Sequence, residues 1–301
     1  MVNNALSVVV PIYNEEESLP LFLPGLVEHC QNKNWSLILV NDGSNDQTKS
    51  ILDDYAQIPG VEVYHHGVNH GYGGALKTGI AHASTPYTVT IDADGQHSHA
   101  DIDALFQVAI GEQADLVVGS RPPEFMASSF RSTGKWIIRN FARFLMPMPI
   151  KDLNSGFKLY QTELAQKYIE LCPDTMAFSD IITLVFINQR HLVVEHPITV
   201  KKRIAGKSTI NLYTAFDTLI NILNIAMMFN PLRVFLPLSF LFILLGIGWG
   251  LPFILMGRGL SVGAVLAIFT GLLFFVIGLV AQQLSAIRLQ LINQKSHKKE
   301  T

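Results

Sequence analysis

Two aspartates at alternate positions carry the clearest chemistry in this sequence. They stand in Asp92-Ala93-Asp94-Gly95-Gln96, directly after a short apolar run rich in β-branched residues. At an irregular strand end, side chains two residues apart can converge on one hard cation, and carboxylate and amide oxygens suit Mg²⁺ or Mn²⁺. A cation held by Asp92, Asp94 and Gln96 would neutralise charge on a departing diphosphate. The alternative is a simple polar turn, because Asp and Gly are common turn formers.

A glycine-rich segment is the second candidate. Gly71-Tyr72-Gly73-Gly74, with Lys77 close behind, opens a predicted helix whose backbone amides could face an anion. A tight turn with close helix packing explains the same glycines, and the segment does not match the dinucleotide-binding fingerprint. Five nearby histidines show no zinc-ligand spacing with cysteines, which favours surface roles for His65, His66, His70, His97 and His99.

The elements that would position these residues alternate along the first 200 residues. Apolar, β-branched runs predict strands at 6–10, 37–40, 61–64, 87–91 and 116–118, and helical patterns lie between them at 15–30, 46–57 and 74–83. This alternation predicts an α/β fold with a mostly parallel sheet. Ligands bind at the carboxyl ends of such strands, where Tyr13, Glu15, Asp42 and Asp92 follow.

The composition indicates that the chain is not soluble along its whole length. Of 301 residues, 49% are apolar and 15% are charged, against roughly 25% charged in typical soluble domains. Residues 1–196 carry 12 basic and 22 acidic side chains, whereas residues 197–301 carry 10 basic and 2 acidic ones. A basic segment beside long apolar runs indicates binding to an anionic membrane surface rather than to nucleic acid. Two cysteines exclude a disulfide framework.

Two uncharged runs, 234–256 and 260–281, are each long enough to cross a membrane, and Arg258 carries the one charge between them. Basic residues flank the pair on both outer sides, and the first residues do not resemble a signal peptide. The positive-inside rule then places both termini and the α/β domain in the cytoplasm, at an inner or plasma membrane. Residues 212–229 predict an amphipathic helix in the interface, with a third span or a packing helix as alternatives. The expected organisation is a catalytic domain at 1–210, an interfacial helix at 211–232, a transmembrane hairpin at 233–284 and a basic tail at 285–301.

Five motifs, in this order, support a family resemblance. Segments 10–15 (VPIYNE), 41–46 (NDGSND) and 92–97 (DADGQH) resemble family 2 glycosyltransferases with the GT-A fold. Segments 152–158 (DLNSGFK) and 203–208 (RIAGKS) narrow the resemblance to polyprenyl-phosphate glycosyltransferases, the group that includes dolichol-phosphate mannose synthase. The resemblance covers roughly residues 5–210, and a membrane hairpin is common after this domain in that group.

The resemblance implies a role for each matching residue on the donor side. The residues that would line the nucleotide pocket are Pro11, Tyr13 and Glu15, and Asp42 would bind the base. Asp92 would lie near the ribose and the metal. Asp94 would be the main metal ligand, assisted by Gln96.

Basic residues are implied on the reacting and acceptor sides. Arg121 would face the diphosphate or the reaction centre, and Arg203 would hold an acceptor phosphate. A second acceptor-side cation is expected from Arg139, with Arg131 and Lys135 as alternatives. Asp180 would contact a sugar hydroxyl.

The implied reaction is metal-dependent, inverting transfer of a sugar from a UDP- or GDP-sugar to undecaprenyl or dolichyl phosphate at the cytoplasmic membrane face. A phosphate monoester has a second pKa near 6, so the acceptor is already a dianion and needs no strong general base. Two alternatives stay open: a membrane glycosyltransferase that extends a lipid-linked saccharide hydroxyl, and a catalytically silent membrane scaffold. The sequence leaves the sugar, the nucleotide and a homo-oligomeric state open.

Overall fold

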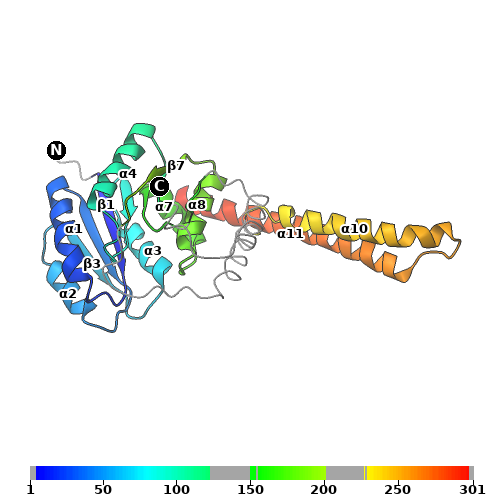
Figure 1. Ribbon diagram of the computed structural model, residues 1–301, viewed down its shortest axis with the longest axis horizontal. Coiled ribbons are helices and arrows are strands. Elements are labelled where there is room, and N and C mark those ends of the chain that lie inside the picture. Colours follow the sequence, from blue (N-terminus) through cyan, green and yellow to red (C-terminus); the bar gives the residue numbers. More distant parts are fainter. Residues whose placement is uncertain (1–4, 123–149, 154, 201–226, 228, 298–301) are drawn as a thin grey trace. The chain divides into compact units, whose positions relative to one another are not determined.

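The computed structural model describes residues 5–122, 150–153, 155–200, 227 and 229–297. These residues form two compact units (Figure 1). One contains the sheet and the other contains two long apolar helices, and each is described by itself.

The first unit is built on a seven-stranded sheet with the order β3-β2-β1-β4-β6-β5-β7. Strands β1 to β4 pair in parallel and so do β5 and β7, whereas β6 runs antiparallel to both β4 and β5. The strands are β1 (Leu6–Ile12), β2 (Ser36–Asn41), β3 (Val61–His65), β4 (Tyr87–Thr90), β5 (Leu116–Ser120), β6 (Lys158–Gln161) and β7 (Val193–Pro197). The expected α/β class and mostly parallel sheet are confirmed.

Strands β6 and β7 are additions to the sequence-based prediction. Strand β6 has four residues and carries a lysine, and β7 contains Glu195 and His196, so neither shows a clear apolar run. Strand β1, in contrast, is buried along its whole length, as expected of a central parallel strand covered on both faces.

Helices cover the sheet (Figure 1). Residues with positive φ mark two of the helix ends: α1 is followed by Asn34, with a φ of 54°, and α3 is preceded by Gly71, with a φ of 89°. The helices of this unit are α1 (Leu19–Lys33), α2 (Thr48–Tyr55), α3 (Tyr72–His82), α4 (His99–Glu112), α7 (Thr162–Tyr168), α8 (Phe178–Asn188) and the short 3₁₀ helix Ile169–Leu171.

The strand directions bring distant loops to one edge of the sheet. Ile12 pairs with Asn41 and Val9 pairs with Thr90, so β1, β2 and β4 end at the same edge. Because β6 is antiparallel to both neighbours, β5 runs in the same direction as β4. Arg121, just after β5, and Gly156, just before β6, therefore reach this edge too.

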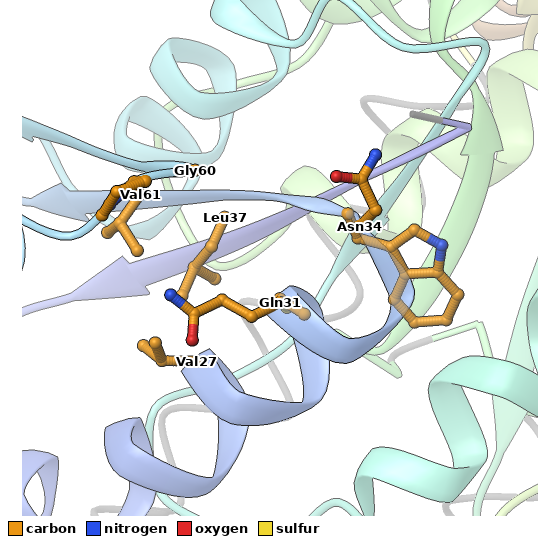
Figure 2. A pocket seen from close by; sticks show the side chains of 9 residues that line it. Val27, Gln31, Asn34, Leu37, Gly60 and Val61 are labelled. Carbon is orange, nitrogen blue, oxygen red and sulfur yellow. The ribbon is translucent and has the colours of Figure 1, made fainter. Parts of the chain in front are cut away.

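A cavity of about 350 Å³ lies at the opposite edge (Figure 2). Leu37 and Val61, at the starts of β2 and β3, line it together with residues from the end of α1. Its walls are mostly apolar, and it is remote from the carboxyl ends of the strands, so it is not the predicted ligand site.

The second unit is a hairpin of α10 (Leu232–Leu255) and α11 (Val262–His297). Both helices contain stretches long and apolar enough to cross a membrane, at Leu232–Leu255 and Val262–Arg288. Glycines allow close contact: a Cβ at Gly271 would lie 2.6 Å from Cγ1 of Ile243. Helix α11 extends to His297, beyond the apolar run expected at 260–281, so the helix is longer than its apolar part. The predicted interfacial helix lies almost wholly outside the described residues.

Candidate active site

Asp92 and Asp94 follow β4 at the carboxyl edge of the sheet. The phenol of Tyr72, the first residue of α3, donates a hydrogen bond of 2.9 Å to Oδ1 of Asp92. The backbone N–H of Gln96 donates to Oδ1 of Asp94 at 3.1 Å, across a turn in which Gly95 has a φ of 69°. Burial raises the pKa of Tyr72 well above its usual value, and the charge of Asp92 adds to the shift, so the phenol stays protonated.

The two carboxylates offer hard oxygen donors, which fit Mg²⁺ or Mn²⁺. No group of three or more His, Cys, Asp or Glu side chains that could hold a metal ion occurs within the described residues. A cation on Asp92 and Asp94 would therefore need further oxygens from elsewhere, and substrate phosphates commonly supply them for Mg²⁺.

Arg121 is fixed at the same edge by Asp152. Its Nε and Nη2 each donate to a different carboxylate oxygen of Asp152 at 2.8 Å, and its backbone N–H adds a third bond at 3.0 Å. Glu195 in β7 accepts the N–H of Asp152 at 2.8 Å and so supports the pair. Burial alone would raise the pKa of Asp152, but the hydrogen bonds and charge of Arg121 outweigh it and hold that pKa below its usual range.

Lys158 and Asp180 extend this charged cluster inward. The Lys158 ammonium is fully buried and donates to the carbonyl oxygens of Leu153, at 2.7 Å, and Ser179. Burial lowers the pKa of Lys158 to about 7, although Asp180 and Asp152 favour its charged form. Asp180 is half-buried in the first turn of α8, and its enclosed Oδ1 has no hydrogen-bond partner among the described residues. Burial raises the pKa of Asp180 despite the nearby Lys158.

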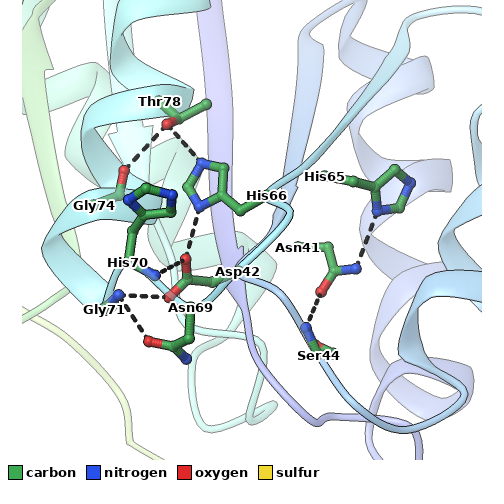
Figure 3. A network of polar contacts seen from close by, with 10 residues as sticks. All are labelled: Asn41, Asp42, Ser44, His65, His66, Asn69, His70, Gly71, Gly74 and Thr78. Carbon is green, nitrogen blue, oxygen red and sulfur yellow. Dashed lines mark hydrogen bonds and ion pairs between the residues drawn. The ribbon is translucent and has the colours of Figure 1, made fainter.

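The Asp42 side chain lies in a polar network with His66, His70 and Gly71 (Figure 3). Only 2% of Asp42 is exposed, and its carboxylate accepts the N–H groups of His70 at 2.9 Å and Gly71 at 2.8 Å. Its Oδ1 also lies 2.7 Å from Nδ1 of His66, and Nε2 of that ring lies 2.8 Å from the Thr78 hydroxyl. Asp42 therefore ties the end of β2 to the start of α3. Its expected contact with the nucleotide base stays a prediction.

The glycine segment serves close packing. The amide of Gly73 donates to the carbonyl of Asp174 at 2.9 Å, and a Cβ at Gly71 would lie 2.5 Å from that same oxygen. The Asp174 side chain pairs with Lys77 at 2.6 Å. Of the two explanations for these glycines, an anion site and a tight turn, the structure supports the tight turn, because protein groups already occupy the start of this helix.

The residues expected around the nucleotide lie after β1 and differ in exposure. Pro11 is buried inside the strand, whereas Tyr13 is 44% exposed just beyond it. The backbone N–H of Glu15 donates to the Thr48 hydroxyl at 3.0 Å, and Ser18 donates to the Glu15 carboxylate. The expected acceptor-side cations Arg203, Arg139, Arg131 and Lys135 lie outside the described residues.

Several contributors were not assigned a role from the sequence: Tyr72, Asp152, Lys158 and Glu195. Asp152 and Lys158 belong to one of the motifs that carried the resemblance, which was the available signal. Tyr72 stands in the glycine-rich segment 71–74, but that pattern points to the backbone and not to the tyrosine side chain. Nothing in the local sequence marks Glu195, and both residues reach the site through contacts with other elements.

Among proteins of known function, this chain is similar to bacterial transferases over most of its length. It is 27% identical over 296 residues to undecaprenyl-phosphate 4-deoxy-4-formamido-L-arabinose transferase of Edwardsiella ictaluri, covering 94% of this chain and 89% of that protein. It is 31% identical over 216 residues to polyprenol monophosphomannose synthase of Mycolicibacterium smegmatis, covering 67% and 79%.

Solved structures support the fold. Glucosyl-3-phosphoglycerate synthase from Mycobacterium tuberculosis, in complex with Mn²⁺, UDP-glucose and phosphoglyceric acid, matches with a TM-score of 0.54 and 17% identity over 74% of this chain and 80% of that one. S. aureus TarS in complex with UDP matches with a TM-score of 0.50 and 19% identity, over 73% and 66%.

Family matches cover both units of the chain. Residues 230–287, which include most of the hairpin, match the GtrB C-terminal hairpin. Residues 7–169, which hold Asp92, Asp94, Arg121 and Asp152, match Glycosyl transferase family 2. The sheet unit is thus a GT-A-like glycosyltransferase domain, and the chain belongs to glycosyl transferase family 2.

Proposed function

We propose that this chain transfers a sugar from a UDP- or GDP-sugar to a polyprenyl phosphate at the cytoplasmic face of a membrane. The observation that carries the proposal is the convergence of Asp92, Asp94 and Arg121 at one edge of the sheet. Two further facts support it: the chain continues into two helices of membrane-spanning length, and relatives covering most of the chain are named for undecaprenyl-phosphate and polyprenol substrates.

A divalent cation, Mg²⁺ or Mn²⁺, is part of the proposal. Asp92 and Asp94 would hold it together with the donor diphosphate, with Gln96 assisting, because the two carboxylates alone leave its coordination incomplete. When bound, the cation would neutralise charge on the leaving nucleoside diphosphate. A crystal structure of similar fold holds Mn²⁺ with UDP-glucose, which supports a divalent cation in general.

The protein side of the mechanism is positioning and charge stabilisation. The bidentate pair with Asp152 holds Arg121 in place, while 28% of the Arg121 side chain stays exposed and can face the diphosphate. Tyr13 offers an exposed ring for the base, and Asp180 would accept a hydrogen bond from a sugar hydroxyl. The acceptor phosphate is already a dianion at neutral pH, so it would attack the anomeric carbon directly and invert it.

The acceptor would be held by Arg203 with a second cation, Arg139 or its alternatives Arg131 and Lys135. In this arrangement α10 and α11 cross the membrane, Arg258 stands in the outer turn, and both termini lie in the cytoplasm, because basic residues are concentrated outside the hairpin turn. Residues 211–232 would lie in the interface and bring the lipid phosphate to the catalytic domain at 1–210.

The test is an extraction assay on membranes that contain the full chain. The membranes are incubated with Mg²⁺ or Mn²⁺, undecaprenyl phosphate and single radiolabelled UDP- or GDP-sugars, and label is counted in the organic phase. We expect a mild-acid-labile lipid product from one donor, and no product with undecaprenol, which lacks the phosphate.

The controls separate the competing functions. Equal transfer to undecaprenol and undecaprenyl phosphate would contradict the proposal and favour extension of a saccharide or lipid hydroxyl. No lipid product from any donor, with no binding of UDP- or GDP-sugars in the presence of Mn²⁺, would favour a silent scaffold.

A further inference from the structure

The Tyr72 side chain contacts Asp92, one of the two proposed metal ligands, although Tyr72 belongs to a different element. It is the first residue of α3, and its hydroxyl donates to Oδ1 of Asp92 at 2.9 Å. The preceding residue, Gly71, has a φ of 89°, and its N–H is bound by the buried carboxylate of Asp42. The backbone that carries Tyr72 is therefore fixed just before the side chain reaches Asp92.

Gly156 closes the other side of this contact. A Cβ at Gly156 would lie 2.5 Å from the Tyr72 hydroxyl oxygen and 3.0 Å and 3.3 Å from the two carboxylate oxygens of Asp92. Real Cβ atoms do not approach other atoms at 2.5 Å, so only glycine fits while the pair keeps this arrangement. Three segments, the start of α3, the end of β4 and the loop before β6, thus meet at one carboxylate.

A carboxylate that serves a metal is commonly oriented by a hydrogen-bond donor behind it, and losing such a donor costs roughly 10–100-fold in metal affinity or activity. We propose that Tyr72 is a positioning residue that holds Asp92 in the orientation in which it binds a divalent cation together with the nucleoside diphosphate of the donor. This inference rests on the proposed function, because it takes Asp92 as a ligand of that cation.

The test compares Mn²⁺ binding by the full chain and by Tyr72→Phe in detergent, with UDP or GDP present, using electron paramagnetic resonance of free Mn²⁺. The substitution removes one oxygen and keeps the ring. We expect a roughly 10–100-fold weaker apparent Mn²⁺ affinity, with transfer recovering as Mn²⁺ is raised, and an unchanged melting temperature without metal.

The matched control is Tyr64→Phe. Its hydroxyl also donates to a carboxylate, that of Glu62 at 2.7 Å, but this hydrogen bond lies at the surface, on β3. We expect Mn²⁺ affinity to stay unchanged in this variant. Gly156→Ala is the second variant, because its Cβ displaces the same hydroxyl, and it should weaken Mn²⁺ binding as well.

The outcomes separate the inference from the function on which it rests. Mn²⁺ affinity equal to that of the unaltered chain, in a folded Tyr72→Phe or Gly156→Ala protein, would overturn the inference alone. If the unaltered chain shows no nucleotide-dependent Mn²⁺ binding, the proposed function fails and the inference fails with it.

Discussion

Replacing Asp152 with asparagine should release Arg121 and cost both stability and transfer. The substitution keeps the size of the side chain but removes the charge that Arg121 faces. It weakens a bidentate pair with two bonds of 2.8 Å and a third bond to the Arg121 backbone at 3.0 Å. The Asp152 side chain is 4% exposed, so water replaces little of what is lost.

The size of the effect follows from burial. Breaking a fully buried pair costs about 3–5 kcal/mol, but Arg121 is 28% exposed and regains part of its hydration. The side-chain amide oxygen of the introduced asparagine would also still accept one hydrogen bond. We therefore expect a loss of about 2 kcal/mol, or roughly 4–8 °C in melting temperature for a unit of this size. A displaced Arg121 should lower kcat on the order of 100-fold, as misplacement by about 1 Å can do.

The assay pairs thermal melting of the detergent-solubilised full chain with the lipid-transfer assay, and Asp53→Asn is the control. Asp53 is 53% exposed and pairs with Lys49 and His65 on the surface, where such pairs contribute about 0–1 kcal/mol. A melting temperature for Asp152→Asn within roughly 1–2 °C of the unaltered chain, well below the expected shift, together with unchanged kcat, would refute the reasoning.

The pH dependence supplies a further check on the same pair. Arg121 holds the pKa of Asp152 below its ordinary value of 3.8 in the folded chain. The stabilisation that the Asp152–Arg121 pair gives to the folded chain is therefore complete above that value. It is lost as the pH falls through the pKa of Asp152 in the folded chain. The difference in melting temperature between the unaltered chain and Asp152→Asn should be constant near neutral pH and should shrink in acid.

Three further predictions concern packing and the metal. Gly79→Ala should destabilise the sheet unit by about 1–3 kcal/mol, because the added Cβ would lie 2.2 Å from a valine methyl of β1. The control is Gly111→Ala: its Cβ would have no atom within 4 Å, so the melting temperature should stay unchanged or rise. Gly271→Val should loosen the hairpin and speed its proteolysis in detergent, because its Cβ would lie 2.8 Å from a backbone oxygen of α10; Gly248→Val, with open space around it, should not. Chelation with EDTA should abolish transfer, and added Mn²⁺ should restore it in the unaltered chain but not in Asp94→Ala; restoration in both would remove Asp94 from the metal site.

The sequence by itself determined the features that depend on local pattern. Alternating apolar strands and helices predicted the α/β class, because burial on both faces of a parallel sheet demands such runs. The lengths of the two uncharged runs predicted the hairpin, because a membrane span must be apolar over its whole length. The order of five short motifs predicted the family. Each signal lies within one segment, so it can be read without knowing what that segment touches.

Only the tertiary structure decided which side chains meet. The insertion of antiparallel β6 between β4 and β5 brought Gly156 beside Asp92, and the turn before α3 brought Tyr72 to the same carboxylate. The same packing paired Arg121 with Asp152, 31 residues away. These partners are chosen by strand order, direction and the space left between elements, and no property of a single segment encodes them.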